Sequence, residues 1–211
     1  MKPLFVTFEG GEGSGKSTLI KHISSWLTEH GLPHLVTREP GGTPFGEKVR
    51  DTVLDAGCDK ISAKTELLLF LAARLEHVEK VIAPHLEQGC VVLCDRFIDS
   101  TVAYQGYGRG EDPARVWALS LEVVPLLPHI TFYLDVPIEV GFKRVAHRHQ
   151  GIDRLEREAF SFHERVREGF FHLARSCPSR ISVLDATRAK DSVQADAEKI
   201  LAKKLGLPYA S

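Results

Sequence analysis

Asparagine is absent from this sequence of 211 residues. The chain therefore has no guanine-reading NKxD motif, and no Asp is followed three residues later by Gly, so the DxxG element of GTPase switches is missing too. Long apolar runs are also missing. No segment approaches the roughly eighteen apolar residues of a membrane span, and Glu9 and Gly10 interrupt the apolar start of the chain too early for a signal peptide. These absences exclude a GTPase and predict a protein that is not bound to a membrane.

Neither sign of charge dominates, since the formal net charge is −1. No global basic field points to nucleic acid or to an anionic membrane, so any positive potential must be local. The four cysteines are scattered. Cys90 and Cys94 lie in one strand-like run, roughly 13 Å apart at strand rise, which is too far for a disulfide, and no cysteine has zinc-site spacing. We therefore expect a reduced, cytoplasmic protein with no nucleic-acid or membrane partner.

Five apolar runs rich in β-branched and aromatic residues predict buried strands at 4–8, 34–37, 90–94, 130–134 and 181–184. They mostly lack polar alternation, as central strands of a parallel sheet do. Helical patterns lie between them, so strands alternate with helices along the chain. This order predicts an α/β fold, with a five-stranded parallel sheet flanked by helices on both faces.

The helical segments are recognised by apolar spacing. One stripe consists of Leu19, Ile23 and Leu27. A longer stripe lies on a helix that we expect to end or bend near Pro84. Later helices are expected at 113–124, 137–147, 155–176 and 190–205. No repeat or linker is present, which predicts a single domain over residues 1–211. The longer stripe comprises Leu67, Leu71, Leu75, Val78 and Ile82.

The stretch "FEGGEGSGKST" contains the phosphate-binding loop, or P-loop, motif GxxxxGKS between a predicted strand and a predicted helix. Its glycines allow backbone N–H groups to turn toward phosphate, and the helix that follows adds its N-terminal dipole. Lys16 is expected to contact the β- and γ-phosphates of ATP, and the Ser17 hydroxyl to ligate Mg²⁺. With GTPases excluded and large motors too long, small-molecule kinases remain, which predicts a three-layer P-loop kinase fold. The expected ATP-phosphate residues are Gly10, Gly11, Glu12, Gly13, Ser14, Gly15, Lys16, Ser17 and Thr18.

Asp95 and Arg96 follow the third predicted strand directly. An acid at the carboxyl end of a central strand lies where open α/β sheets bind ligands. Asp95 is expected to hold Mg²⁺ through water, and Arg96 to bind a second phosphate with its planar guanidinium. The alternative is an aspartate that only caps the following turn.

Phe70 and Arg74 are four residues apart and share a helix face that differs from the leucine stripe. A ring beside a guanidinium suits a nucleobase, although such a pair is more often a core Phe beside a surface Arg. Further polar groups follow in the glycine-rich segment 99–110, which we expect to be mobile. Its Ser100, Thr101, Tyr104 and Gln105 are candidates for hydrogen bonds to a base or sugar.

Together, "FEGGEGSGKST", "TREPGGT", "LLLFLAAR", "DRF" followed by "STVAYQGYGRG", and "YLDVPIEVGFKR" resemble the motifs of bacterial thymidylate kinases. The resemblance runs from about residue 4 to residue 185. It implies transfer of the γ-phosphoryl group of ATP to the 5′-phosphate of dTMP, giving dTDP for dTTP synthesis. It also implies a homodimer with a short lid at about 143–157.

The resemblance assigns roles on the acceptor side. Phe70 stacks on thymine, and Arg74 donates to its carbonyl oxygen. Ser100 and Thr101 read the base edge, and Tyr104 packs against C2′ of the sugar and disfavours a 2′-hydroxyl.

Other roles implied by the resemblance concern phosphates and the ATP base. Arg96 holds the acceptor phosphate with help from Arg50, and Arg38 and Pro40 of the "TREPGGT" turn are also expected to bind dTMP. A cis peptide is expected before Pro40. The loop 185–187 borders the adenine, with Arg188 beside the ring.

The P-loop carries Glu12 and no arginine, so a cation must come from elsewhere. The lid supplies it in the resemblance, and the catalytic candidates there are Arg144, Arg148 and Arg154. Arg157 is expected on a solvated face. Glu12 is expected to face the acceptor, near the sugar 3′-oxygen, and Glu9 to order the P-loop from behind.

Two alternatives to a dTMP kinase stay open. One is another nucleoside or nucleotide kinase of the same fold, and the arginines for an acceptor phosphate favour a monophosphate acceptor. The other is a regulatory nucleotide-binding protein that no longer catalyses. Intact Lys16, Ser17, Asp95 and Arg96 argue against that second alternative.

Overall fold

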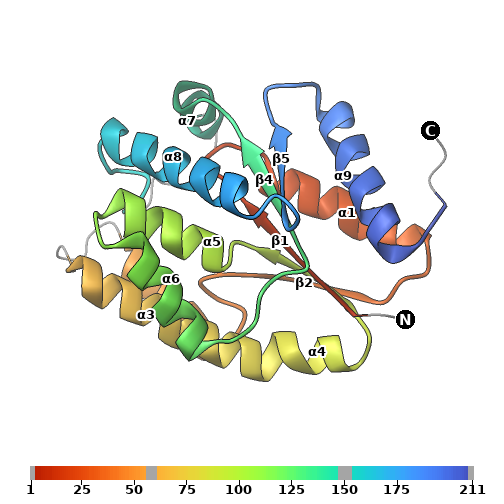
Figure 1. Cartoon of the computed structure of the whole chain (residues 1–211), viewed down its shortest axis with the longest axis horizontal. Helices are drawn as coiled ribbons and strands as arrows, with labels where there is room; N and C mark the ends of the chain where they lie inside the picture. Colours follow the sequence, from red (N-terminus) through yellow and green to blue (C-terminus); the bar gives the residue numbers. More distant parts are fainter. Residues whose placement is uncertain (1–2, 56–60, 147–153, 209–211) are drawn as a thin grey trace.

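The structure is a computed structural model that describes residues 3–55, 61–146 and 154–208. Five parallel strands form one sheet in the order β2-β3-β1-β4-β5, with helices on both faces (Figure 1). This confirms the predicted α/β class and the parallel sheet. The strands are β1 Leu4–Glu9, β2 His34–Arg38, β3 Val91–Asp95, β4 Ile130–Asp135 and β5 Ile181–Asp185.

The strands lie where the apolar runs predict them, and each continues one residue further, onto a charged side chain. The hydrogen-bonded ladder includes these last residues, as the register Phe8 to Asp95 and Arg38 to Asp95 shows. Because all five strands point the same way, their charged ends gather along one edge of the sheet. These end residues are Glu9, Arg38, Asp95, Asp135 and Asp185.

The helices cover the sheet unequally. On one face α1 and α9 pack against residues such as Phe8, Phe132 and Leu134. The other face carries α3 to α6 and α8, which pack against residues such as Phe5 and Tyr133 (Figure 1). The helices are α1 Lys16–Glu29, α2 Pro44–Leu54, α3 Ala63–His77, α4 Ala83–Glu87, α5 Ile98–Thr101, α6 Pro113–Val123, α7 Ile138–Ala146, α8 Phe160–Ser176 and α9 Lys190–Leu205, with π-helical η1 Val78–Ile82 and η2 Val102–Gly108.

The long helix does not end near Pro84. It changes from α to π over η1 and then continues as α4, with Pro84 in the first turn of α4. In a regular α-helix the proline ring would collide with the carbonyl four residues earlier, and the wider π turn removes that contact. The leucine stripe is also corrected at one position, because Leu75 is 37% exposed whereas Leu67 and Leu71 are buried.

The segment 99–110 is helical rather than mobile, contrary to the sequence-based expectation. It forms the end of α5 and all of η2, and Ser100 to Gln105 are buried. Its glycines serve close packing: a Cβ on Gly108 would lie 2.7 Å from the Phe162 ring on α8.

A further correction concerns α8, which begins at Phe160 and not at Leu155.

Within the described ranges, no helix combines the length and the apolar character needed to cross a membrane.

Candidate active site

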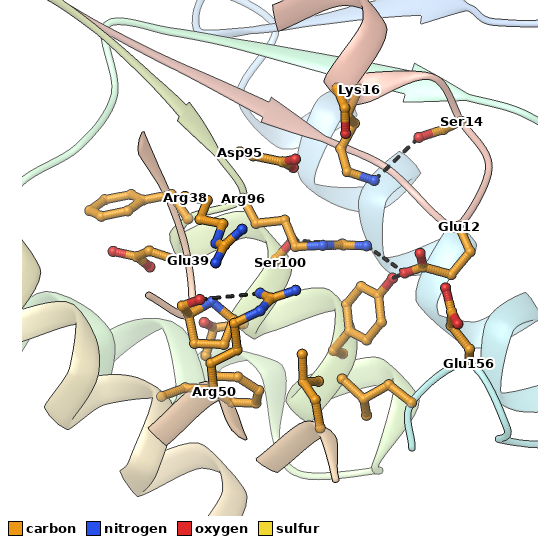
Figure 2. A pocket seen from close by; sticks show the side chains of 18 of the residues that line it. Glu12, Ser14, Lys16, Arg38, Glu39, Arg50, Asp95, Arg96, Ser100 and Glu156 are labelled. Carbon is orange, nitrogen blue, oxygen red and sulfur yellow. Dashed lines mark hydrogen bonds and ion pairs between the residues drawn. The ribbon is translucent and has the colours of Figure 1, made fainter. Parts of the chain in front are cut away.

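A pocket of about 460 Å³ opens at the carboxyl edge of β1, β2 and β3. The P-loop follows β1, the central strand, and Asp95 ends the neighbouring β3. Figure 2 shows Lys16 and Asp95 at one end of this pocket, with Arg96 extending toward Glu12. The lining consists of residues 12–17, 38–40 and 95–97 together with Arg50, Leu54, Phe70, Arg74, Ser100, Thr101, Tyr104, Gln105, Leu155 and Glu156.

The P-loop takes the backbone shape that its glycines predict. Gly10 and Gly15 have φ angles of 143° and 94°, in the region that favours glycine. Lys16 Nζ donates hydrogen bonds to the carbonyls of Gly10 at 3.0 Å and Gly11 at 3.1 Å. The N-terminus of α1 has no side-chain cap, so its first N–H groups suit a phosphate. Gly10 and Gly11 stand outside the pocket lining, and Thr18 is exposed on α1.

Glu12 is neutralised by Arg96. Its Oε1 accepts from Arg96 Nη2 at 2.6 Å and from the Tyr104 hydroxyl at 3.3 Å. Burial raises the pKa of Glu12, but Arg96 and Lys16 outweigh that effect and hold the pKa below its ordinary value. The positive partner of the P-loop carboxylate thus comes from the end of β3, a source that the sequence analysis did not assign.

Arg96 adopts φ 69°, which is uncommon for a residue with a side chain. Its backbone N–H donates to the Phe8 carbonyl at 3.0 Å. The next N–H, of Phe97, donates to Glu9 Oε1 at 2.8 Å, and the Ser100 hydroxyl donates to Glu9 Oε2. Glu9 therefore orders the segment after β3, not the P-loop, and this corrects the expectation from the sequence. Burial, reinforced by the Asp99 carboxylate, raises the pKa of Glu9 to about 8.

Asp95 presents a buried oxygen to the pocket. Its Oδ1 has no hydrogen-bond partner among the described residues, and it lines the same cavity as Lys16 and Ser17. A buried carboxylate oxygen without a donor is costly. Mg²⁺ with its water shell, which prefers oxygen ligands, fits this position.

The base end of the pocket is built on α3. Arg74 is buried and donates from Nε to Glu39 Oε2 at 2.7 Å and from Nη2 to Thr101 Oγ1 at 2.8 Å. His77 contacts the other Glu39 oxygen at 3.1 Å. The remaining nitrogen, Arg74 Nη1, is buried without a hydrogen-bond partner in the described part of the chain. Phe70 is half-buried and lines the pocket on the same helix.

Two further arginines line the cavity, Arg38 from the end of β2 and Arg50 from α2. Arg50 Nη1 donates to the Pro40 carbonyl at 3.2 Å. Arg38 is more exposed and pairs with Glu47 at 2.9 Å. The Glu39–Pro40 peptide is cis, as the resemblance implies. With Arg96, these arginines give the middle of the pocket a positive character (Figure 2).

A buried ionic cluster that the sequence analysis missed lies beside the base end. Glu66 of α3 accepts from Arg109 at 3.1 Å, from Arg154 and from Gln105 Nε2 at 2.9 Å. Arg109 also donates to Glu158 Oε1 at 2.5 Å. The role of Arg109 is therefore to join η2 to the segment before α8. Glu66 follows Lys64 and Thr65 in the polar first turn of α3, so its local sequence gave no signal for the cluster.

Two of the predicted lid arginines, Arg144 and Arg154, lie apart from the pocket. Arg144 donates to the carbonyls of Gly13 at 3.3 Å and Ala186 at 3.0 Å. Arg154 donates to the Val53 carbonyl at 2.8 Å as well as to Glu66. Neither residue lines the cavity. Arg148 lies outside the described residues.

The root of the lid touches the P-loop backbone. A Cβ placed on Gly13 would lie 2.1 Å from the Gly141 carbonyl, and one placed on Gly141 would lie 2.3 Å from the Glu12 carbonyl. Gly13 also has φ 68°. This approach explains physically why the loop has no side chain at position 13.

The loop after β5 is closed locally. Asp185 Oδ1 accepts from the Thr187 N–H at 2.9 Å and from the Thr187 hydroxyl at 2.6 Å. Arg188 pairs with Asp196 on α9 at 2.6 Å. Asp185 thus caps a turn. That the loop 185–187 borders the adenine of ATP stays a prediction.

The remaining lining residues that the sequence analysis left unassigned are Glu39, Leu54, Phe97, Leu155 and Glu156. Glu39 stands next to the predicted Pro40, so its position was signalled by the "TREPGGT" motif. Leu155 and Glu156 come from the end of the predicted lid, before α8, and Figure 2 draws Glu156 below Glu12 at the same pocket. Nothing in their local sequence indicates a pocket.

A P-loop after the central strand of a parallel sheet, with an acid and an arginine at the end of the next strand, defines the class of P-loop kinases. The thymidylate kinase family model matches residues 8–197, so the chain belongs to the thymidylate kinase family. It is 46% identical over 204 residues to a thymidylate kinase of Marinomonas sp. (strain MWYL1), with 96% of both chains covered. It is 45% identical over 194 residues to one of Carboxydothermus hydrogenoformans, with 92% of this chain and 94% of the other covered. The crystal structure of thymidylate kinase from Ehrlichia chaffeensis matches with a TM-score of 0.77 at 36% identity, and covers 95% of this chain and 99% of that one.

Proposed function

We propose that this protein transfers the γ-phosphoryl group of ATP to the 5′-phosphate of dTMP, giving ADP and dTDP. One observation carries the proposal: a single cavity is lined by the P-loop at one end and by Phe70 and Arg74 at the other, with arginines between them. Membership of the thymidylate kinase family supports the same reaction.

The cavity divides into three parts with different chemistry. The P-loop end, with Lys16, holds the ATP phosphates. The arginine-rich middle, with Arg50 and Arg96, holds the acceptor phosphate, since guanidinium groups bind phosphate oxygens in pairs. The base end holds thymine between the Phe70 ring and the polar groups of η2. Phosphoryl transfer depends on positioning and charge neutralisation, and two adjacent phosphate sites in one cavity would meet both needs.

Mg²⁺ belongs to the proposal through Asp95 and Ser17. The unpartnered Asp95 Oδ1 supports a hydrated ion at this point. When bound, the ion neutralises charge on the ATP phosphates. Asp95 would hold the ion at the strand end, and Lys16 supplies a positive charge from α1. Glu12 stays ionised and orients Arg96 toward the acceptor side.

Tyr104 fits the proposed sugar position. It is buried, lies under the Arg96 guanidinium at 4.9 Å and lines the cavity. Its ring is fixed by packing against Phe162 and Phe170. A fixed ring excludes a 2′-hydroxyl by steric contact, which favours a deoxyribose acceptor.

We also propose a homodimer located in the cytoplasm. Leu68 and Leu75 lie two turns apart on α3 and are 59% and 37% exposed. Exposed leucines on one helix face suit contact with a second copy. Cys90, Cys94 and Cys177 are free thiols, which is compatible with a reducing compartment.

The test is an assay of ADP release with ATP, Mg²⁺ and one acceptor at a time: dTMP, dUMP, dCMP, dGMP, UMP or thymidine. The expected order is dTMP first, dUMP less well and dGMP hardly at all. A Lys16→Ala variant serves as the inactive control for contaminating kinases. A higher kcat/KM with dGMP, or with thymidine in place of a monophosphate, contradicts the proposal.

A further inference from the structure

Glu66 contacts no part of the expected substrate, yet it holds a residue that does. Its side chain is almost fully buried and accepts from Gln105 Nε2 at 2.9 Å. Gln105 is 2% exposed and lines the cavity. The other polar atom of this amide, Gln105 Oε1, makes no hydrogen bond within the described ranges. Because Nε2 faces Glu66, Oε1 lies on the side away from Glu66.

The orientation of the Gln105 amide follows from the ionisation of Glu66. Burial raises the pKa of Glu66, but the hydrogen bonds from Arg109, Arg154 and Gln105 prevail and keep the pKa below its ordinary value. An ionised carboxylate only accepts hydrogen bonds. The Gln105 amide must therefore turn its NH₂ group toward Glu66, which leaves its carbonyl oxygen for the cavity.

Arg74 presents the opposite polarity at the same end. Its Nη1 is buried, has no hydrogen-bond partner among the described residues and can only donate. The base end therefore combines one fixed donor with one fixed acceptor. Thymine offers the matching pair, a carbonyl O4 that accepts and an N3–H that donates. Cytosine offers the reverse, an amino group at C4 that donates and an N3 that accepts.

We propose that Glu66 is a specificity-determining residue that acts through Gln105: it fixes the side-chain amide so that the enzyme accepts the thymine edge and rejects the cytosine edge. This inference rests on the proposed function, because it takes dTMP as the acceptor. Glu66 is a positioning residue, since it contacts Gln105 and not the base.

The arginine partners of Glu66 explain why a buried carboxylate is used. Arg109 and Arg154 compensate its charge from two sides, and the Arg109 guanidinium lies 4.8 Å from the Phe162 ring centre. A neutral glutamine at this position would carry its own NH₂ group. It would then accept either orientation of the Gln105 amide, and the acceptor facing the base would no longer be fixed.

The experiment measures kcat/KM for dTMP and dCMP in the wild type and in Glu66→Gln. The wild-type ratio tests the proposed function by itself. If dTMP is not the better substrate, the proposed function fails whatever the variant does. If dTMP is preferred, Glu66→Gln is expected to lower the dTMP-to-dCMP ratio by about tenfold or more, because a polar mismatch in a buried site carries most of such discrimination.

The matched control is Glu158→Gln. It removes a carboxylate from the same Arg109 but does not contact Gln105, so the ratio is expected to stay at the wild-type value. A Gln105→Met variant should lower the ratio, and adding Glu66→Gln to it should change the ratio no further. A general loss of activity on both substrates, with the ratio within about twofold of wild type, overturns the inference.

Thermal unfolding is measured for each variant. If Glu66→Gln does not fold, the charge-balanced Glu66→Gln/Arg109→Met protein replaces it, and Arg109→Met alone becomes its reference. The same fall in the ratio supports the inference in that pair, and an unchanged ratio overturns it.

Discussion

The guanidinium of Arg96 and the carboxylate of Glu12 lie 2.6 Å apart, although 84 positions separate them in the sequence. The contact joins the P-loop to the end of β3, and both side chains are about four-fifths buried. Arg96 reaches Glu12 from a left-handed backbone conformation with φ 69°. Conformational strain of this kind persists only where surrounding contacts hold it. The two phosphate sites of the proposed enzyme are therefore fixed relative to each other by one ion pair.

The first prediction is a double-mutant cycle on this pair. Glu12→Gln and Arg96→Lys should each lower kcat/KM for dTMP, since lysine lacks the planar group that contacts both Glu12 and Ser100. The double variant should lose less than the sum of the two single losses, with a coupling of about 1–3 kcal/mol. Strictly additive losses would show that the two residues act independently.

The second prediction concerns the contact between α7 and the P-loop. Gly141→Ala should lower kcat/KM for ATP about tenfold or more, because its Cβ must push the Glu12 carbonyl away. Alanine stabilises an isolated helix relative to glycine by about 1 kcal/mol. Helix propensity alone therefore predicts a more stable α7 and no loss of kcat/KM, the opposite of what the close contact predicts. Glu139→Ala, at an exposed position of the same helix, is the control. Steady-state kinetics at varied ATP decide, and an unchanged KM and kcat would contradict the contact.

A third prediction follows from the buried Glu9, whose pKa is raised to about 8. The unfolded chain releases this proton near pH 4.5, the ordinary value, whereas the folded protein keeps it up to about pH 8. The folded state thus binds more protons in this window, and the contribution of Glu9 to stability falls as pH rises from about 4.5 to 8. Glu9→Gln removes the titration and can keep both hydrogen bonds.

The measurement is urea unfolding of wild type and Glu9→Gln at several pH values. The free energy of unfolding of the variant, relative to wild type, should increase from pH 5 to pH 8. Ser182→Ala, on β5 away from this carboxylate, serves as a control with a pH-independent difference. A constant difference for Glu9→Gln as well would mean that Glu9 is ionised throughout.

The fold was predictable because buried parallel strands leave long apolar runs in the sequence. The apolar runs end one residue before each strand does, because the last residue of each strand is charged, as Glu9 and Asp95 are. The pair Phe70 and Arg74 was found from helix spacing alone, which is a local property. Both kinds of signal depend on neighbours within a few positions.

The errors have a different origin. Glycine and polar residues in segment 99–110 suggested mobility, but Gly108 serves a close approach to Phe162 on a distant helix. Glu66 and Arg154 form an ion pair across 88 positions, and no local pattern contains that information. Contacts of this kind depend on the topology of the whole sheet. The expectations for Glu9 and Leu75 were wrong for the same reason, because the contacts of both residues depend on the topology of the whole sheet.

The fourth prediction tests the proposed homodimer. Leu68→Glu with Leu75→Glu places two charges on the exposed face of α3 and should convert a dimer into a monomer, because burying unpaired carboxylates is unfavourable. Phe160→Glu is the matched control, since Phe160 is 43% exposed on α8. Sedimentation equilibrium gives the masses. A dimer that persists in the double variant would place the interface elsewhere.

The last prediction concerns the positive charge that the P-loop lacks. Arg144 holds the Gly13 and Ala186 carbonyls, and Arg154 holds Glu66. We expect loss of Arg144 to raise KM for ATP, since it loosens the P-loop, and loss of Arg154 to disturb the base end. Arg148 is the residue that we predict to act on the transferring phosphoryl group when the lid closes.

Arg148→Ala should therefore lower kcat by at least about 10²-fold, with only a few-fold change in the affinities for ATP and dTMP. Groups that act mainly on the transition state show this separation between rate and ground-state binding. Single-turnover kinetics and calorimetry measure the two quantities, and Arg157→Ala, at an exposed position, is the control expected to be nearly silent. A lid arginine is worth about 10³–10⁵ in rate where it reaches the phosphoryl group. If Arg144→Ala, Arg148→Ala and Arg154→Ala each leave kcat within about threefold of wild type, far below that range, then Lys16 and Arg96 supply the charge without the lid.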